Sequence, residues 1–392
     1  MRRKTRWAAV AALAVVALAT AAIATSGNGS TNNKTFEFTV GLWGDMPYSD
    51  TQAQQGVPNL IADMNNSDIS FSIHDGDLKA GNSTTGSVTP TVCSDALYTQ
   101  ALTYLNSLDQ PAFFTPGDND WVDCDRPSNG GYNELERLQY EREHLFNTDR
   151  SFGKKTLPTE VQSTPDCVGT KNTVAGSTAD QFPTACVENR RWSFHGVTFA
   201  TLNVQGTCNN LCTSGGNPPA NDAGGDPPEY QARNAADIAW LDATFAEAKA
   251  NGSAGVMIVW QADPGFDTSG YQGAPKRDSQ TLAPGDTTKA PGFQDLLSEL
   301  RTQTIAFKKP VVLVHGDSHY FMIDKPLLDS QGRELENFTR VETYGDNTFS
   351  SHPEWDDNHV HWVKALIDPS SRDVFAFQPQ VVPANRVAVP SP

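Results

Sequence analysis

The stretch Phe36-Glu-Phe-Thr-Val-Gly-Leu42 alternates apolar and polar side chains and runs into Gly44-Asp45-Met46-Pro47. A period of two predicts a β-strand with one buried face, and this strand delivers Asp45 at its end. Two later stretches repeat the arrangement: Ile69-Ser-Phe-Ser-Ile73 precedes Gly76-Asp77, and Pro111-Ala-Phe-Phe114 precedes Gly117-Asp118-Asn119-Asp120. Three predicted strands therefore each end at a Gly-Asp pair.

Two further apolar stretches also end in polar residues: Val256-Met-Ile-Val-Trp260 leads to Gln261-Ala-Asp263, and Val311-Val-Leu-Val314 leads to His315-Gly-Asp-Ser-His319. Between the strands, residues 94–108 and about 234–251 repeat apolar side chains at helical spacing. Strands that alternate with helices indicate an α/β fold with covered sheet faces. From Phe338 onward the alternation returns and predicts antiparallel strands that complete a sheet.

The first residues combine a basic head with an apolar run from Ala8 to Ala24. This pattern predicts a signal peptide over residues 1–24, with an uncleaved membrane anchor as the alternative, and hence a secreted or extracytoplasmic protein. No later stretch is long and apolar enough to cross a bilayer, so we expect no stable membrane insertion after cleavage. No internal repeat divides the remainder, which predicts a single domain over residues 35–380.

The formal net charge is −17, and such an acidic surface repels polyanions, so no nucleic-acid partner is expected. The six cysteines are an even number, which in an oxidising compartment predicts three disulfides. Sequence neighbours favour the pairs Cys93 with Cys124, Cys167 with Cys186, and Cys208 with Cys212. A cysteine zinc site is the alternative, and only the last pair has a spacing near to that of zinc ligands.

The strand ends carry the side chains that suggest chemistry. Open α/β sheets bind ligands at the carboxyl ends of their strands, so we expect these residues to converge there: Asp45, Asp77, Asp118, Gln261, Asp317 and His319. Four carboxylates repel one another in a shared crevice, and one or two divalent cations would neutralise them. The alternative for each Gly-Asp pair is an ordinary turn after a strand.

The order of these motifs resembles that of the calcineurin-like metallophosphoesterase family, whose pattern is D-x-H, G-D, G-N-H-D/E, a His near a Pro, and G-H-x-H. The segment Ala239-Trp240-Leu241-Asp242 also looks like the family's Trp-Leu helix before the fourth motif. The resemblance implies a layered α-β-β-α sandwich in which the cysteine-bearing loops are insertions. It also implies hydrolysis of a phosphate mono- or diester by a metal-activated hydroxide.

By this resemblance, Asp45, Asp77 and His319 would hold one metal, and Asp77 would bridge to a second held by Asp118, Gln261 and Asp317. Only the first three match the family in residue type. Pro47 stands at the place of a ligating His, and Asp118 replaces an Asn. Gln261 or Ala262 replaces a His, and Asp317 replaces the first His of the last motif. A shift from imidazole to carboxylate ligands favours manganese, magnesium or calcium over iron or zinc.

Asn119 stands where the family has the His that steadies or protonates the reacting phosphate, and an amide cannot donate a proton as an acid. Asp120 or His315 would then have to act as the acid. Lys79 and Arg126 are candidates for binding the substrate phosphate, with ordinary surface cations as the alternative.

Three more histidines are weaker site candidates: His359 and His361, which share a face if they lie on a strand, and His74. The sequence thus predicts a metal-dependent phosphoesterase whose phosphate-ester substrate is open. The alternative is a catalytically silent relative that binds a ligand or a partner, since Pro47 and Asn119 replace functional histidines.

Overall fold

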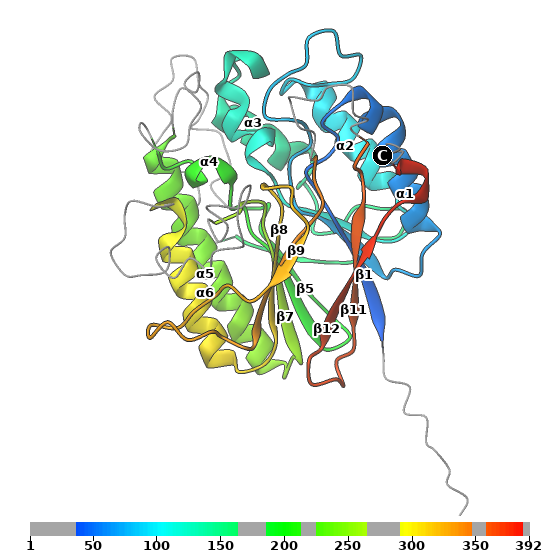
Figure 1. Ribbon diagram of the computed structural model, residues 1–392. Coiled ribbons are helices and arrows are strands. Elements are labelled where there is room, and N and C mark those ends of the chain that lie inside the picture. Colours follow the sequence, from blue (N-terminus) through cyan, green and yellow to red (C-terminus); the bar gives the residue numbers. More distant parts are fainter. Residues whose placement is uncertain (1–36, 164–185, 213–224, 265–290, 347–357, 387–392) are drawn as a thin grey trace, which may run out of the picture. The chain divides into compact units, whose positions relative to one another are not determined.

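Two β-sheets organise the chain in the computed structural model, which describes residues 37–163, 186–212, 225–264, 291–346 and 358–386 (Figure 1). The first sheet has five strands in the order β12-β11-β1-β2-β3, and the second has seven in the order β4-β5-β6-β7-β8-β10-β9. The predicted signal peptide and Cys167 lie outside the described residues.

The five-stranded sheet is built on three parallel strands, β1 (Phe38–Trp43), β2 (Phe71–His74) and β3 (Ala112–Phe114). Helix α1 (Val57–Asn65) connects the first two, and α2 (Asp95–Ser107) connects the second and third. Strands β11 (Trp362–Ile367) and β12 (Phe375–Gln380) extend the sheet antiparallel beyond β1. The carboxyl ends of β1, β2 and β3 therefore lie at one edge.

The seven-stranded sheet has a parallel centre made of β6 (Val197–Thr201), β7 (Gly255–Val259), β8 (Val311–His315) and β10 (Phe338–Glu342). The long helix α5 (Pro227–Ala250) joins β6 to β7, and α6 (Gln294–Phe307) joins β7 to β8. Its remaining strands are antiparallel to their neighbours: β4 (Glu160–Val161), β5 (Arg190–Phe194) and β9 (Met322–Asp324).

The two sheets pack face to face through one hydrophobic cluster. This cluster includes Val40, Phe71 and Ile73 of the first sheet and Phe199 and Val312 of the second. All five side chains are buried from solvent. Burial of each such side chain contributes about 1.5–3 kcal/mol, so the interface between the sheets is a major source of stability.

Helices cover the outer face of each sheet (Figure 1). A second cluster joins α1 and α2 to the five-stranded sheet through Leu60 and Leu97, and a third joins α5 and α6 to the seven-stranded sheet through Leu241 and Leu297. The layers are therefore helix, sheet, sheet and helix, which confirms the predicted α-β-β-α sandwich.

Helix α5 begins at Pro227, well before the predicted start near Asn234. Prolines occupy its first turn, where the backbone needs no N–H donor, and the Asp226 side chain accepts a hydrogen bond from the Glu229 amide at 3.1 Å. The predicted start was too late because the proline-containing first turn lacks the apolar periodicity that predicted the rest of the helix.

The prediction for the C-terminal strands was partly wrong. Strand β10 is parallel to β8 in the seven-stranded sheet, whereas β11 and β12 belong to the other sheet. Alternation along a strand does not say which sheet it joins. His359 and His361 also precede β11, which starts at Trp362, so they do not share the face of a strand.

Two of the three predicted disulfides are present, Cys93–Cys124 and Cys208–Cys212. Cys186 is also disulfide-bonded, and its predicted partner Cys167 lies outside the described residues. No helix in the described part of the chain has the length and apolar character that a membrane span requires.

Candidate metal centre

The loops that follow β1, β2, β3, β7 and β8 meet at the carboxyl edge of the two sheets. The Asp45 amide donates to the Gly76 carbonyl at 2.9 Å, and the Gly316 amide donates to the Gln261 carbonyl at 3.0 Å. The Asp317 amide donates to both oxygens of Asp45 at 3.1 Å. These bonds join loops of both sheets, so the predicted convergence of the strand-end residues is present in the structure.

Four of the six predicted ligands lie in the left-handed region of backbone conformation: Asp45 (φ 50°), Asp77 (φ 62°), Asp317 (φ 73°) and His319 (φ 65°). Such a conformation costs a residue with a side chain about 1–3 kcal/mol and persists only where the surroundings hold it. Backbone strain of this kind gathers at functional sites, and here it coincides with the residues that the motifs single out.

Asp45, Asp77 and His319 form the tightest group, and we call them the first cluster. Each offers one ligand atom, and these atoms all lie within 4.8 Å of one another. Asp45 and Asp77 are buried, whereas the His319 side chain is 23% exposed, and its Nε2 lies 3.4 Å from Asp45 Oδ1. The His319 Nδ1 atom is fixed by the carbonyl of Asp346 at 2.6 Å. The Nε2 atom therefore faces the carboxylates, as a metal ligand requires.

Glycines allow these loops to approach so closely. A Cβ atom on Gly117 would lie 2.0 Å from Asp77 Oδ1, and one on Gly316 would lie 1.8 Å from Asp45 Oδ2. Both distances are far below van der Waals contact, so any side chain at either position would displace a carboxylate of the first cluster.

A second group consists of Asp118, Gln261 and Asp317. Its carboxylates already accept hydrogen bonds from neighbouring groups of the protein. Gln261 Nε2 donates to Asp118 Oδ1 at 3.3 Å, and Thr207 donates its hydroxyl to Asp118 Oδ2 at 2.7 Å. The Asp263 amide donates to Asp317 Oδ2 at 2.9 Å. Asp118 and Asp317 still share a space, because a Cβ atom on Gly206 would lie 2.4 Å from Asp118 Oδ2 and 2.9 Å from Asp317 Oδ1.

Charge accumulates where these groups meet. Burial, followed by the charges of Asp118 and Asp45, raises the pKa of Asp77 well above its usual value. Burial and the charges of Asp118 and its neighbours do the same to the pKa of Asp317. Burial alone would lower the pKa of His319, but its hydrogen bond and attraction to Asp45 raise it to about 9. A divalent cation would relieve this repulsion, and the oxygen-rich donor set fits a hard ion.

Tyr48 is a site residue that the sequence motifs did not reveal. Its hydroxyl oxygen lies 2.8 Å from Asp77 Oδ2, 3.3 Å from Asp45 Oδ1 and 3.2 Å from His319 Nε2. Asn119 Nδ2 donates to the same oxygen at 3.2 Å. The one available signal was its position, since Tyr48 is the first side chain after Pro47 that carries an oxygen atom.

Asn119 faces the first cluster, and Asp120 does not. The Asn119 side chain donates to Asp77 Oδ2 at 2.7 Å and its backbone amide donates to Asp77 Oδ1 at 3.2 Å. Asp120 accepts three backbone amides, those of Asp77 (3.0 Å), Leu78 (2.6 Å) and Gly117 (2.7 Å). Both of its oxygens thus fix the loops after β2 and β3. These bonds hold Asp120 away from the first cluster, although burial raises its pKa to about 7, and its role as an acid stays a prediction.

The remaining histidine candidates lie in the protein interior. His315 is inaccessible at the end of β8, and its Nδ1 lies 2.9 Å from the Gly316 carbonyl. His74 accepts the Gly76 amide at 3.1 Å through Nδ1, and burial lowers its pKa to about 4. His361 packs edge-on against Tyr344, and burial lowers its pKa. His74 and His361 are therefore better explained as neutral structural side chains, and His315 as a buried structural one.

Lys79 and Arg126 are buried, and both face carboxylates. Arg126 pairs with Asp123 at 2.5 Å and donates to the Gly81 carbonyl at 3.2 Å. Lys79 donates to the Ala80 carbonyl at 2.9 Å, and burial lowers its pKa to about 8 although nearby carboxylates oppose that shift. They are therefore not ordinary surface cations. Their positive charges partly balance nearby carboxylates, that of Asp123 above all.

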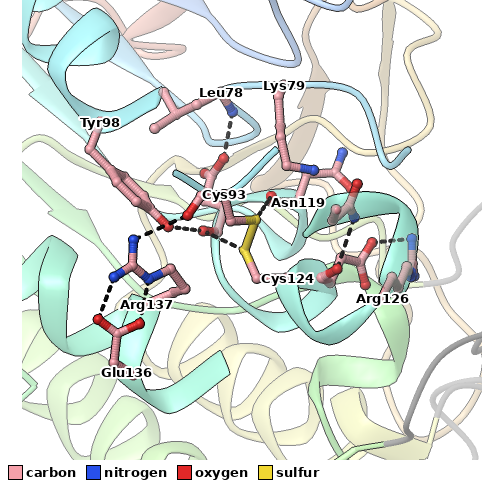
Figure 2. The surroundings of a disulfide bond; sticks show 12 residues. Leu78, Lys79, Cys93, Tyr98, Asn119, Cys124, Arg126, Glu136 and Arg137 are labelled. Atoms are coloured by element: carbon pink, nitrogen blue, oxygen red, sulfur yellow. Dashed lines mark hydrogen bonds and ion pairs between the residues drawn. A yellow bond between two sulfur atoms is a disulfide. The ribbon is translucent and has the colours of Figure 1, made fainter. Parts of the chain in front are cut away.

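The Cys93–Cys124 disulfide packs against the loop after β3 (Figure 2). Its sulfur atoms contact two backbone carbonyls of that loop, Cys93 Sγ that of Asn119 at 3.7 Å and Cys124 Sγ that of Asp120 at 3.2 Å. Tyr98 donates its hydroxyl to the Asp120 carbonyl at 2.7 Å. Figure 2 shows Lys79, Asn119 and Arg126 on one side of this disulfide, with Tyr98 and Arg137 on the other.

The chain matches no protein-family model and no curated protein sequence. Among solved structures it is similar to GAP50, the anchor in the inner membrane complex of Plasmodium, with a TM-score of 0.40 and 9% identity over 88% of this chain and 89% of that one. It is also similar to the 5'-nucleotidase of Candida albicans SC5314, with a TM-score of 0.35 and 12% identity over 87% of this chain and 50% of that one.

A third similar structure is the sulfate thiohydrolase SoxB of Thermus thermophilus, with a TM-score of 0.36 and 9% identity over 87% of this chain and 44% of that one. The chain thus spans about half the length of the last two proteins. Similarities at these scores assign neither a family nor an activity.

Proposed function

We propose that this chain is an exported, metal-dependent phosphoesterase of the calcineurin-like kind, which hydrolyses a phosphate mono- or diester. The observation that carries the proposal is the first cluster, in which Asp45, Asp77 and His319 place their ligand atoms within 4.8 Å of one another at the end of strands from both sheets. The motif order that predicted this meeting is the motif order of that family.

The donor set supports one strongly held ion and one weakly held ion. Asp45, Asp77 and His319 would hold the first, and Asp118, Gln261 and Asp317, whose polar atoms are partly engaged by the protein, would hold the second. Divalent ions bound there would polarise a phosphoryl oxygen and lower the pKa of a water molecule. The carboxylate-rich set favours manganese, magnesium or calcium over zinc or iron.

The chain's own side chains would orient the substrate more than they would transfer protons to it. Asn119 can donate a hydrogen bond to a phosphate oxygen through Nδ2, which already reaches the first cluster. It cannot protonate a leaving group. Asp120 is engaged by the backbone, and Lys79 and Arg126 are engaged by neighbouring carbonyls and carboxylates. The proposed enzyme should therefore favour esters whose leaving group departs without a proton, such as aryl esters.

The test is elemental metal analysis of the purified protein, paired with hydrolysis of aryl mono- and diesters in the presence of manganese, magnesium, calcium or zinc. We expect bound or recruited metal and a turnover that Asp77→Asn removes. Asp109→Asn is the matched control, because Asp109 forms an exposed pair with Lys154 far from the ligand motifs. A wild-type protein that binds no divalent metal and cleaves no ester would contradict the proposal.

A second function is favoured by one observation, namely that Asn119 and Asp120 leave the first cluster without a proton donor of the kind that the family uses. A catalytically silent protein could use the same site to bind a ligand or a partner. Metal binding without turnover of any ester, together with a metal-dependent rise in the melting temperature, would select this alternative.

A further inference from the structure

We infer that Tyr48 is an oxygen ligand of the ion held by the first cluster, in the place of the imidazole that the loop lacks at Pro47. This inference rests on the proposed function, because it concerns the same metal site. It names a residue that belongs to none of the strand-end motifs.

The position of the hydroxyl oxygen carries the inference. The Tyr48 oxygen lies 2.8 Å from Asp77 Oδ2, 3.3 Å from Asp45 Oδ1 and 3.2 Å from His319 Nε2. These are one donor atom from each of the three residues of the first cluster. An ion bound by those residues would therefore lie next to the Tyr48 oxygen.

In the metal-free structure the Tyr48 oxygen makes the hydrogen bonds that an ion at this position would replace. A phenol has one proton, so Tyr48 can donate to one carboxylate at a time, while Asp77 and Asp45 both lie within reach. Asn119 Nδ2 already donates to the same oxygen at 3.2 Å. A cation at the centre of these oxygens would satisfy both carboxylates and the phenol oxygen together, and oxygen is the donor that hard divalent ions prefer.

The chain holds Tyr48 in this orientation from both ends. The Tyr48 amide donates to Oε1 of the buried Gln52 at 2.7 Å, which fixes the backbone of the loop. The Tyr48 ring packs edge-on against His319, with the ring centroids 5.0 Å apart and the planes 74° apart. The hydroxyl is therefore held beside the imidazole of His319, as a ligand of the same ion requires.

The alternative is that the Tyr48 hydroxyl occupies the position of the ion and must move away when the metal binds. The two readings predict opposite signs for the removal of the hydroxyl. If Tyr48 is a ligand, Tyr48→Phe weakens metal binding. If the hydroxyl blocks the position, the same change strengthens it.

The experiment is a calorimetric titration of the full-length protein with Mn²⁺ alone, without substrate, comparing wild type, Tyr48→Phe and the control Tyr104→Phe. Tyr104 is a matched control because its hydroxyl donates to the Ala53 carbonyl at 2.7 Å and reaches no carboxylate. We expect Tyr48→Phe to weaken Mn²⁺ binding at least about tenfold, the usual scale for a residue that supports a metal site, and Tyr104→Phe to leave it unchanged.

A second measurement uses the wild-type protein only. Binding of Mn²⁺ should change the near-ultraviolet absorbance of tyrosine, because a metal ion perturbs the phenol ring that it binds. Unchanged or tighter Mn²⁺ binding in Tyr48→Phe, or no tyrosine difference spectrum in the wild type, would overturn the inference and leave the proposed function standing. A wild-type protein that binds no Mn²⁺ would overturn both.

Discussion

Two groups of buried carboxylates lie close to each other in this molecule and differ in their counterions. In one group, Arg142 of α3 (Glu134–His144) pairs with Glu188 at 2.6 Å. In the same group, Arg233 pairs with Glu229 at 2.6 Å within α5. We call this group the arginine layer. In the candidate metal centre, by contrast, no lysine or arginine of the described residues forms an ion pair with Asp45, Asp77, Asp118 or Asp317.

The two groups also differ in the pKa values of their carboxyl groups. Burial opposes the ionisation of Glu188, but Arg142 holds its pKa below the usual value, whereas the pKa values of Asp77 and Asp317 are raised. The arginine layer is neutralised by the chain itself. Among the described residues, the aspartates of the metal centre have only the His319 imidazole within ion-pair distance, at Asp45, so their charge is balanced less completely than that of the arginine layer.

The largest expected effect is in the arginine layer. Glu188→Gln would leave the Arg142 guanidinium buried without its charge partner, and breaking a buried pair in this way costs about 3–5 kcal/mol. The free energy of unfolding in urea measures the loss. Asp109→Asn removes an exposed pair and should cost less than about 1 kcal/mol. Equal effects at both sites would show that the arginine layer contributes no more than a surface pair.

Metal binding should have the next largest effect, and only through the metal centre. An ion that binds the folded state alone adds about 2.7 kcal/mol of stability when its concentration is about 100 times Kd. We expect added Mn²⁺ to raise the urea midpoint of the wild type, and a chelator to reverse the rise. Asp77→Asn should abolish the response, whereas Asp109→Asn should retain it.

The same change from acid to amide should have the opposite sign in the metal-free centre. Asp317→Asn removes a buried carboxyl group whose ionisation is opposed by burial and by Asp118, and it keeps an oxygen that can accept the Asp263 amide. In chelator, we expect the variant to be more stable than the wild type by about 1–2 kcal/mol. A loss of stability in urea unfolding would mean that Asp317 already has an internal counterion.

The smallest effect concerns Asp237, whose nearest arginine, Arg233, is 3.7 Å away. Burial raises the pKa of Asp237 to about 8 from its usual 3.8. Folded Asp237 thus keeps its proton to a higher pH than the unfolded chain does, so the folded state loses stability as the pH rises from about 4 to about 8.

Asp237→Asn should therefore stabilise the protein by about 1 kcal/mol near pH 8, with a smaller gain near pH 5. Urea unfolding of both proteins at the two pH values measures the difference. A gain that does not change with pH would show that Asp237 ionises normally and belongs with the neutralised carboxylates of the arginine layer.

The sequence was sufficient to predict which residues meet, because strand topology constrains them. Parallel strands that each end in a polar residue bring those residues to one edge, and Asp45, Asp77, Asp118, Gln261, Asp317 and His319 do converge there. Side-chain direction was harder. Asp120 follows Asn119 directly, yet it turns to three backbone amides while Asn119 faces the first cluster.

By itself, the sequence determined the α/β class and the set of residues at the carboxyl edge, because periodicity and strand-end motifs are local properties of the chain. Only the tertiary structure decided where the side chains of Tyr48, Lys79 and Arg126 lie. Tyr48 reaches the first cluster because its ring packs on His319, which lies 271 residues away. Lys79 and Arg126 are buried against Asp123 and its neighbours, a loss of solvent that depends on the packing of distant elements.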